Sequence, residues 1–184
     1  MVTLLRDSGL RIGETLGLRR SDLHLLPDSR SVGCAVVGAH VHVCHRANPN
    51  GALAKSRFPR TVPASDAVLA AYADYQFQRV GVLGDDDGDM VFVNLYHEPL
   101  GAAVTYRATK RFFERLATDC GFAVRPHMLR HTAATNWVRA GVDLDVVQRL
   151  LGHASLASTS AYLHARDDDK RRAVTAVAAG ERYR

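Results

Sequence analysis

Hydrophobic residues recur at helical spacing in several stretches of this 184-residue chain. In one of them, Ser65 can cap a helix over residues 65–80, whose apolar side chains at helical spacing are Val68, Leu69, Tyr72 and Tyr75. Similar patterns begin at a cap or a proline and stop at a glycine or a charged turn, which predicts helices at 12–20, 103–121, 126–140, 143–151, 155–165 and 167–179. The chain is therefore predicted to be mainly helical.

The periodicity changes between residues 22 and 63. Apolar and polar residues alternate in AHVHVCHR (39–46), which predicts a strand with Val41 and Val43 on one face. The turn signal NPNG follows, and RTVP (60–63) can form a returning strand. We predict an α+β fold, mainly α-helical, with a small antiparallel three-stranded sheet.

The other face of the predicted strand carries His40, His42 and Cys44. These three could bind zinc, but no fourth ligand follows at a familiar spacing, and His45 points to the opposite face. A half-exposed sheet face is the favoured interpretation, and we expect no metal site.

Composition places the chain among soluble, intracellular proteins. No apolar run approaches the ~20 residues that span a bilayer, and the N-terminus lacks the pattern of a secretion signal. The three cysteines are few and odd in number, which suits a reducing compartment. We therefore expect a cytoplasmic protein without a membrane partner.

Charge is distributed unevenly along the chain. Residues 1–60 carry nine Lys and Arg against four Asp and Glu, and residues 101–150 carry eight against four, whereas residues 61–100 carry one against seven. If the two basic parts meet in space, they form a positive face suited to nucleic acid. Solvated surface charge without a partner explains the same numbers.

The stretch RPHMLRHTAATN places His127, Arg130 and His131 on one face of a helix. Pro126 at the first helical position puts the first two near the helix N-terminus, where backbone N–H groups and the helix dipole favour an anion such as phosphate. The dipole should also depress the pKa of His127. Met128 stands where a zinc-protease helix has glutamate, which weakens the metal interpretation. A capping His127 and a core His131 remain the alternative.

Four stretches in fixed order carry a wider resemblance: SGLRIGETLGLRRSDL (8–23), NPNGALAKSRFPRTVP (48–63), HMLRHTAAT (127–135) and LGHASLASTSAYLHA (151–165). Together they resemble the catalytic domain of the tyrosine recombinases, or phage integrase family, over residues 3–166. The resemblance implies a site-specific recombinase that cleaves and rejoins double-stranded DNA through a 3′-phosphotyrosyl intermediate.

The resemblance also implies roles for individual residues. The predicted catalytic residues are Arg11, Lys55, His127, Arg130, His153 and Tyr162, with Glu14 supporting the first arginine. In these roles the two arginines neutralise phosphate oxygens, the tyrosine attacks phosphorus, His127 takes its proton, and the lysine protonates the leaving oxygen. Predicted DNA contacts are Arg57, Arg60 and His131. No cofactor is expected, and family members act as homo-oligomers, tetramers on DNA.

The family usually carries an N-terminal helical domain that clamps the other side of the DNA. This chain begins almost at the Arg11 motif, so we expect a single catalytic domain, residues 1–184, without that core-binding domain and without strand exchange on its own. Two other functions stay open. Residues 133–155 read like the helix-turn-helix of a non-catalytic DNA-binding protein, and the same catalytic residues could relax supercoils as a type IB topoisomerase does.

Overall fold

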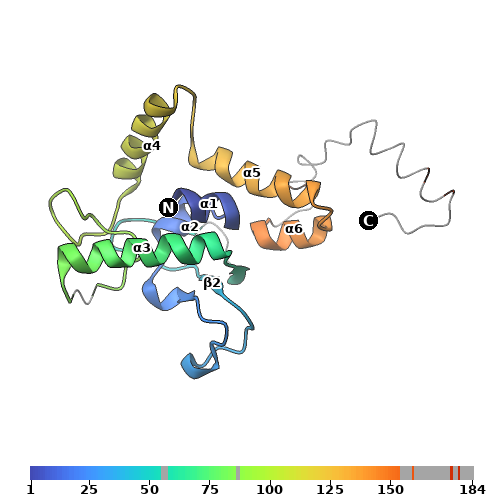
Figure 1. The fold of residues 1–184 in the computed structure, drawn as a ribbon, viewed down its shortest axis with the longest axis horizontal. Helices are drawn as coiled ribbons and strands as arrows, with labels where there is room; N and C mark the ends of the chain where they lie inside the picture. Colours follow the sequence, from blue (N-terminus) through green and yellow to red (C-terminus); the bar gives the residue numbers. More distant parts are fainter. Residues whose placement is uncertain (55–57, 86–87, 154–158, 160–174, 176–177, 179–184) are drawn as a thin grey trace.

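The computed structural model describes residues 1–54, 58–85 and 88–153, with Thr159, Thr175 and Ala178 beyond them. Its elements are α1 (Val2–Ser8), α2 (Ile12–Leu16), η1 (Arg20–Asp22), β1 (Leu23–His24), η2 (Arg30–Val32), β2 (His40–Val43), β3 (Arg60–Pro63), α3 (Asp66–Leu83), α4 (Tyr106–Cys120), α5 (Pro126–Arg139) and α6 (Leu144–Leu151) (Figure 1). The predicted α+β fold, mainly helical with a three-stranded antiparallel sheet, is confirmed.

Local signals set most helix ends. Ser65 caps α3 by accepting a hydrogen bond from the backbone N–H of Val68, and Thr105 caps α4 in the same way. Gly121 and Gly152 end α4 and α6 in the left-handed conformation. The helix predicted at 12–20 is shorter, because it stops at Leu16 and η1 follows, and α1 was not predicted. The helices predicted at 155–165 and 167–179 lie almost wholly outside the described residues.

The turn between α1 and α2 is packed against α5 and α6. Gly9 has a φ of 62°, and a side chain there would meet the ring of Trp137 at 3.0 Å and Leu151 at 3.1 Å. Both the backbone conformation and the close approach therefore require glycine. This contact fixes the start of α2 next to the end of α6.

The sheet has the order β1-β2-β3, and its two faces differ. Val41 pairs with Val62 and with Leu23, and these side chains share the face that packs in the core. His40 pairs with His24 and with Pro63, so these side chains lie on the opposite face. This second face differs from the half-exposed surface that we predicted, because His40 is only 2% exposed.

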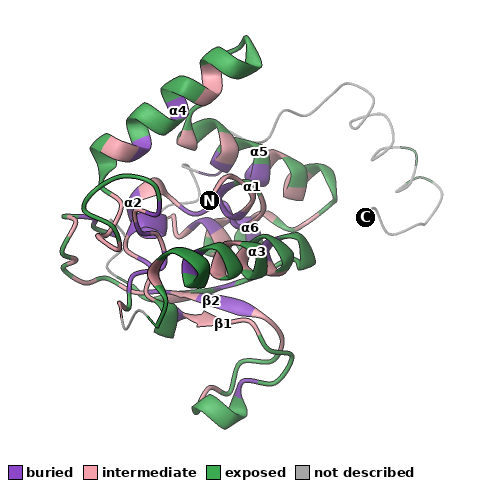
Figure 2. Cartoon of the chain, turned by 60° about the vertical axis from the view of Figure 1, so that its left-hand side comes forward, coloured by how far each residue is buried: buried purple, intermediate pink, exposed green. Residues whose placement is uncertain are grey.

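Helix α4 stands away from the rest of the molecule, and most of its surface is exposed (Figure 2). Helix α3 runs along the core, where Arg79 is buried and donates hydrogen bonds to the carbonyls of Met90 and Gly88. None of the described helices is long and apolar enough to cross a membrane. The three cysteines, Cys34, Cys44 and Cys120, are free thiols.

Candidate active site

Arg11 lies at the junction of α1 and α2, where it is the N-terminal cap residue of α2. Its Nη1 donates to Glu14 Oε1 at 3.2 Å and to the carbonyl of Leu151 at 3.3 Å, and both terminal nitrogens lie 3.5 Å from the carbonyl of Gly152. The guanidinium is therefore held between α2 and the end of α6, while its side chain stays 28% exposed. An arginine fixed in this way needs little reorganisation to meet an anion.

Glu14 is the fully buried carboxylate beneath Arg11. It accepts hydrogen bonds from the backbone N–H of Arg11 at 2.8 Å and from both terminal nitrogens of Arg60 at 3.0 and 2.8 Å. Burial alone would raise the pKa of this carboxyl, but the hydrogen bonds and charges of Arg60 and Arg11 hold the pKa below its usual value. The supporting role predicted for Glu14 agrees with this geometry.

The side chain of Arg60 lies beside Glu14 and is mostly buried. We expected it to contact DNA, but only 10% of its side chain is exposed. Its Nε donates to the carbonyl of Leu150, and its two terminal nitrogens form the two-pronged pair with Glu14. Its side chain therefore braces Glu14 and joins β3 to α6, a part that the sequence motif did not indicate.

Arg130 lies in the second turn of α5 and is 2% exposed. Its two terminal nitrogens donate to the carbonyls of Gly9 and Leu151 at 2.6 and 2.7 Å. The carbonyl of Leu151 thus binds both Arg11 and Arg130, which brings together two guanidinium groups that are 119 positions apart in the sequence.

His127 is the second residue of α5, directly after Pro126, as predicted. Its Nε2 lies 2.7 Å from Nε2 of His131, one helical turn away. The pKa of His127 is lowered, in the predicted direction, but first by burial and then by the charges of His131, Arg130 and Arg11. The ring is therefore held neutral and able to accept a proton.

His153 follows Gly152, which ends α6. Its Nδ1 lies 3.0 Å from Oγ1 of Thr159. Burial lowers the pKa of His153 to about 4, and the charges of Arg130, Arg11 and Arg60 act in the same direction. At neutral pH this side chain is an uncharged hydrogen-bonding group.

Arg11 and three residues of α5 and the end of α6, His127, Arg130 and His153, line one pocket of about 460 Å³, which we call the arginine pocket. Its lining residues are Leu10, Arg11, Ile12, Gly13, Leu53, Tyr106, Pro126, His127, Arg130 and His153. Gly13 makes this arrangement possible, because a side chain there would lie 2.2 Å from the hydroxyl of Tyr106 and 2.5 Å from the carbonyl of Leu53.

The structure thus brings together four of the six predicted catalytic residues, which come from segments separated by up to 142 positions: Arg11, His127, Arg130 and His153. His131 lies beside His127 on the exposed face of α5. Lys55, Arg57 and Tyr162 lie outside the described residues. The sequence did not identify Tyr106 as a residue of the pocket, because nothing around it distinguishes it from the other tyrosines.

Comparison with known proteins supports the family resemblance that the four sequence motifs indicated. The sequence profile of the phage integrase family matches residues 1–169. The chain belongs to the phage integrase family. Among curated relatives, transposase A of transposon Tn554 from Staphylococcus aureus is 32% identical over 92% of this chain and 44% of its own length. Tyrosine recombinase XerC from Chlamydia trachomatis is 30% identical over 89% of this chain and 45% of its own length.

Solved structures of this family share the fold. The crystal structure of XerA recombinase superposes with a TM-score of 0.67 at 27% identity and covers 98% of this chain and 57% of its own. The integrase of transposon Tn1549, in complex with transposon right end DNA, superposes with a TM-score of 0.71 at 24% identity over 96% of this chain and 57% of its own. The chain thus spans about half the length of the integrase family relatives that it matches.

Proposed function

We propose that this chain is the catalytic domain of a site-specific DNA recombinase, which cuts and rejoins double-stranded DNA through a 3′-phosphotyrosyl intermediate. The observation that carries the proposal is the convergence of Arg11, Arg130, His127 and His153 on the arginine pocket. Two guanidinium groups and two neutral imidazoles suit a phosphodiester, whose charge increases in the transition state.

Each described side chain can be given a role. Arg11 and Arg130 neutralise the non-bridging phosphate oxygens, and the buried pair of Glu14 and Arg60 keeps Arg11 in place. His127 is neutral and accepts the proton of the attacking phenol, and His153 hydrogen-bonds a phosphate oxygen.

Two further roles rest on the family resemblance alone. Tyr162 attacks phosphorus in line and displaces the 5′ oxygen, which receives a proton from Lys55. The phosphotyrosyl bond retains the energy of the phosphodiester, so a 5′-hydroxyl can reverse the step without ATP. No metal or other cofactor enters this reaction. Rejoining to a second duplex would require several copies of the protein on DNA.

Covalent capture on DNA tests the proposal. A randomised library of nicked duplexes releases a short fragment after cleavage, so that any phosphotyrosyl adduct cannot rejoin and accumulates. We expect a slow adduct with the native chain and none with Tyr162→Phe. Tyr96→Phe is the matched control, because Tyr96 is 73% exposed and its hydroxyl donates to Gln78 away from the pocket.

The pocket itself contains another tyrosine, Tyr106, which makes the assay more decisive. An adduct that persists in Tyr162→Phe and disappears in Tyr106→Phe would show that Tyr162 is not the nucleophile. No adduct from any variant, with DNA binding intact, would favour a non-catalytic DNA-binding protein. Exchange of strands between two duplexes then separates a recombinase from a DNA-relaxing enzyme.

A further inference from the structure

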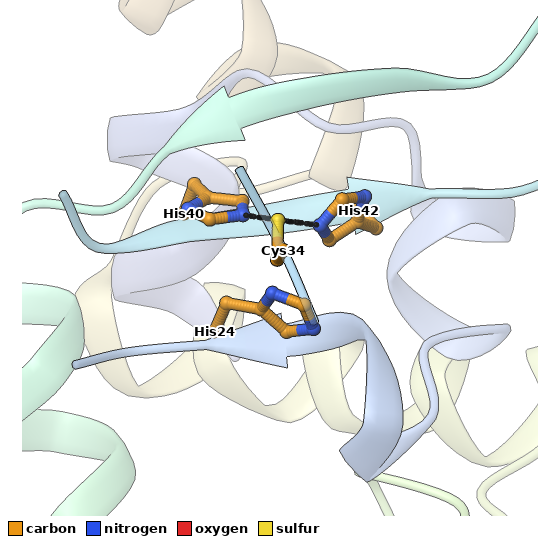
Figure 3. A group of neighbouring side chains, drawn as sticks. All are labelled: His24, Cys34, His40 and His42. Carbon is orange, nitrogen blue, oxygen red and sulfur yellow. Dashed lines mark hydrogen bonds between the residues drawn. The ribbon is translucent and has the colours of Figure 1, made fainter. Parts of the chain in front are cut away.

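A second group of side chains lies on the face of the sheet away from the arginine pocket. It consists of His24 on β1, His40 and His42 on β2, and Cys34 in the segment between these strands, and we call it the sheet cluster (Figure 3). One nitrogen or sulfur atom from each residue lies within 4.8 Å of the other three. Figure 3 shows the four side chains turned towards one another.

Strand register explains why three histidines meet. His24 lies directly opposite His40 in the antiparallel pair, and His42 is two residues further along the same face. The ring centroid of His24 lies 5.0 Å from that of His40 and 4.5 Å from that of His42. Strand alternation placed Cys44 on the same face as His40 and His42, but the sulfur atom beside these rings belongs to Cys34 in the loop.

The distances match those between the ligands of a tetrahedral zinc ion. Sγ of Cys34 lies 3.4 Å from Nε2 of His40 and 3.5 Å from Nε2 of His42, and the two nitrogens are 3.0 Å apart. Bond lengths of about 2.3 Å to sulfur and about 2.0–2.1 Å to nitrogen place tetrahedral ligands about 3.6 Å (S to N) and about 3.3 Å (N to N) apart. These three residues need little rearrangement to enclose an ion, and His24, whose ligand atom lies within 4.8 Å of theirs, would move closer to complete the set.

The protonation of His40 favours metal binding. Its Nδ1 lies 2.7 Å from the carbonyl of Gly38, which can only accept a hydrogen bond, so Nδ1 carries the ring proton. The Nε2 of the neutral ring then presents its lone pair to Cys34 and His42. Orientation of a ligand histidine by a backbone carbonyl is a usual feature of metal sites.

His24 and His42 fit the same interpretation. Nδ1 of His24 is buried and has no hydrogen-bond partner within the described part of the chain. Nε2 of His42 lies 3.0 Å from Nε2 of His40 and 3.5 Å from Sγ of Cys34, so it faces the same space between the side chains. The carboxylate of Asp22 acts on His42, and a negative charge there favours a cation.

We propose that His24, Cys34, His40 and His42 form a structural zinc site that fastens the β1–β2 segment to the sheet. The thiol of Cys34 loses its proton to solvent when the metal binds, and the three neutral imidazoles complete a closed tetrahedral set. With four protein ligands, no position remains for substrate.

The β1–β2 segment makes few contacts that would hold it against the sheet. Residues 25–39 extend from the sheet (Figure 2), and their apolar side chains are largely exposed, with Leu26 at 58%, Val32 at 61% and Val37 at 81%. Few apolar contacts hold the segment, so a bond from Cys34 through a metal to both strands would restrict it.

Metal analysis of the whole chain, purified without a histidine tag, tests the proposal. We expect about one equivalent of bound zinc and a melting temperature that rises by several degrees when zinc is added to metal-free protein. Cobalt substitution should give the visible bands of a tetrahedral ion and a thiolate-to-cobalt charge-transfer band. Less than a tenth of an equivalent, both as purified and after zinc is added, would overturn the proposal.

Two serine variants locate the site. Cys34→Ser should abolish the charge-transfer band and weaken zinc binding by roughly a hundredfold or more in competition with a chromophoric chelator. Cys44→Ser is the matched control, because Cys44 is a free cysteine directly after β2 that lies outside the cluster, and this variant should keep both the charge-transfer band and the zinc affinity. Equal zinc affinity in the two variants, or full affinity in His24→Asn, would contradict the four-ligand site.

Discussion

His127 and His131 pair on α5 beside two arginines, whereas His24, His40 and His42 meet on the sheet beside a cysteine. Both groups hold neighbouring imidazoles at hydrogen-bond distance, with Nε2 atoms 2.7 Å apart on the helix and 3.0 Å apart on the sheet. Their surroundings give them different chemistry. Guanidinium groups attract an anion and repel a metal ion, whereas a thiol that can lose its proton attracts a metal ion.

The two groups also differ in how they are supported. The arginine pocket rests on buried charge, since Glu14 and the guanidinium groups are fixed by one another and by backbone carbonyls. The sheet cluster rests on strand pairing and one long loop. We therefore expect substitutions beneath the pocket to cost more stability than comparable ones elsewhere.

The largest effect is expected from Glu14→Ala. The change leaves the guanidinium groups of Arg60 and Arg11 without their buried partner, which should lower the free energy of unfolding by about 3–5 kcal/mol. Asp89→Ala is the control, because that carboxylate is 47% exposed and 3.7 Å from Arg19, and it should cost less than about 1 kcal/mol. Denaturant unfolding measures both, and equal losses would show that the buried pair contributes nothing special.

The stability of the protein at low pH should also depend on Glu14. Because folding lowers the pKa of Glu14, its contribution is present above the unfolded pKa and is lost as pH falls through the folded pKa. We expect the native chain to lose stability on acidification more steeply than Glu14→Gln. Parallel curves of unfolding free energy against pH would contradict the assignment.

Gly152→Ala should have the next largest effect. Both Gly152 and Gly121 end a helix with positive φ, at 64° and 72°. Alanine costs about 1–2 kcal/mol in either conformation, but at position 152 its methyl group would also lie 2.8 Å from Nη1 of Arg60. We expect Gly121→Ala to show only the conformational cost, and Gly152→Ala to lose more stability and DNA cleavage as well.

A smaller effect concerns His153. Its pKa of about 4 lies below the ordinary 6.5, so the folded chain binds fewer protons and this part of the stability is lost as pH falls from 6.5 towards 4. NMR titration of the ring should show the low pKa directly. In Arg11→Met the pKa of His153 should rise, because one of the repelling charges is gone, and an unchanged value would show that Arg11 does not contribute to the low pKa.

The smallest effect is expected from removing metal with EDTA, which tests whether the sheet cluster and the arginine pocket act independently. EDTA should leave the rate of DNA cleavage unchanged at a temperature where metal-free protein remains folded, because none of the residues with a proposed role in cleavage belongs to the sheet cluster. The sheet cluster lies on the opposite face from Arg60, which pairs with Val43 on the core face. Activity lost in EDTA and restored by zinc under those conditions would show that the two sites are coupled.

The sequence by itself determined the features that depend on neighbouring residues. Helix ends at Ser65, Gly121 and Gly152 follow from local capping, and alternation placed Val41 and Val43 on the buried face. The order of four motifs indicated the family and the pocket residues, although spacing alone could not show that Arg11 and Arg130 share the carbonyl of Leu151.

Only the tertiary structure decided which partners meet across long stretches of chain. Arg60 reaches Glu14, 46 positions away, because β3 lies beside α6, and the same packing buries most of a side chain that was predicted to contact DNA. Cys34 replaces Cys44 in the sheet cluster because the β1–β2 segment folds back over strands whose register places His24 opposite His40. Such contacts depend on loop geometry and strand register, which periodicity along the sequence does not encode.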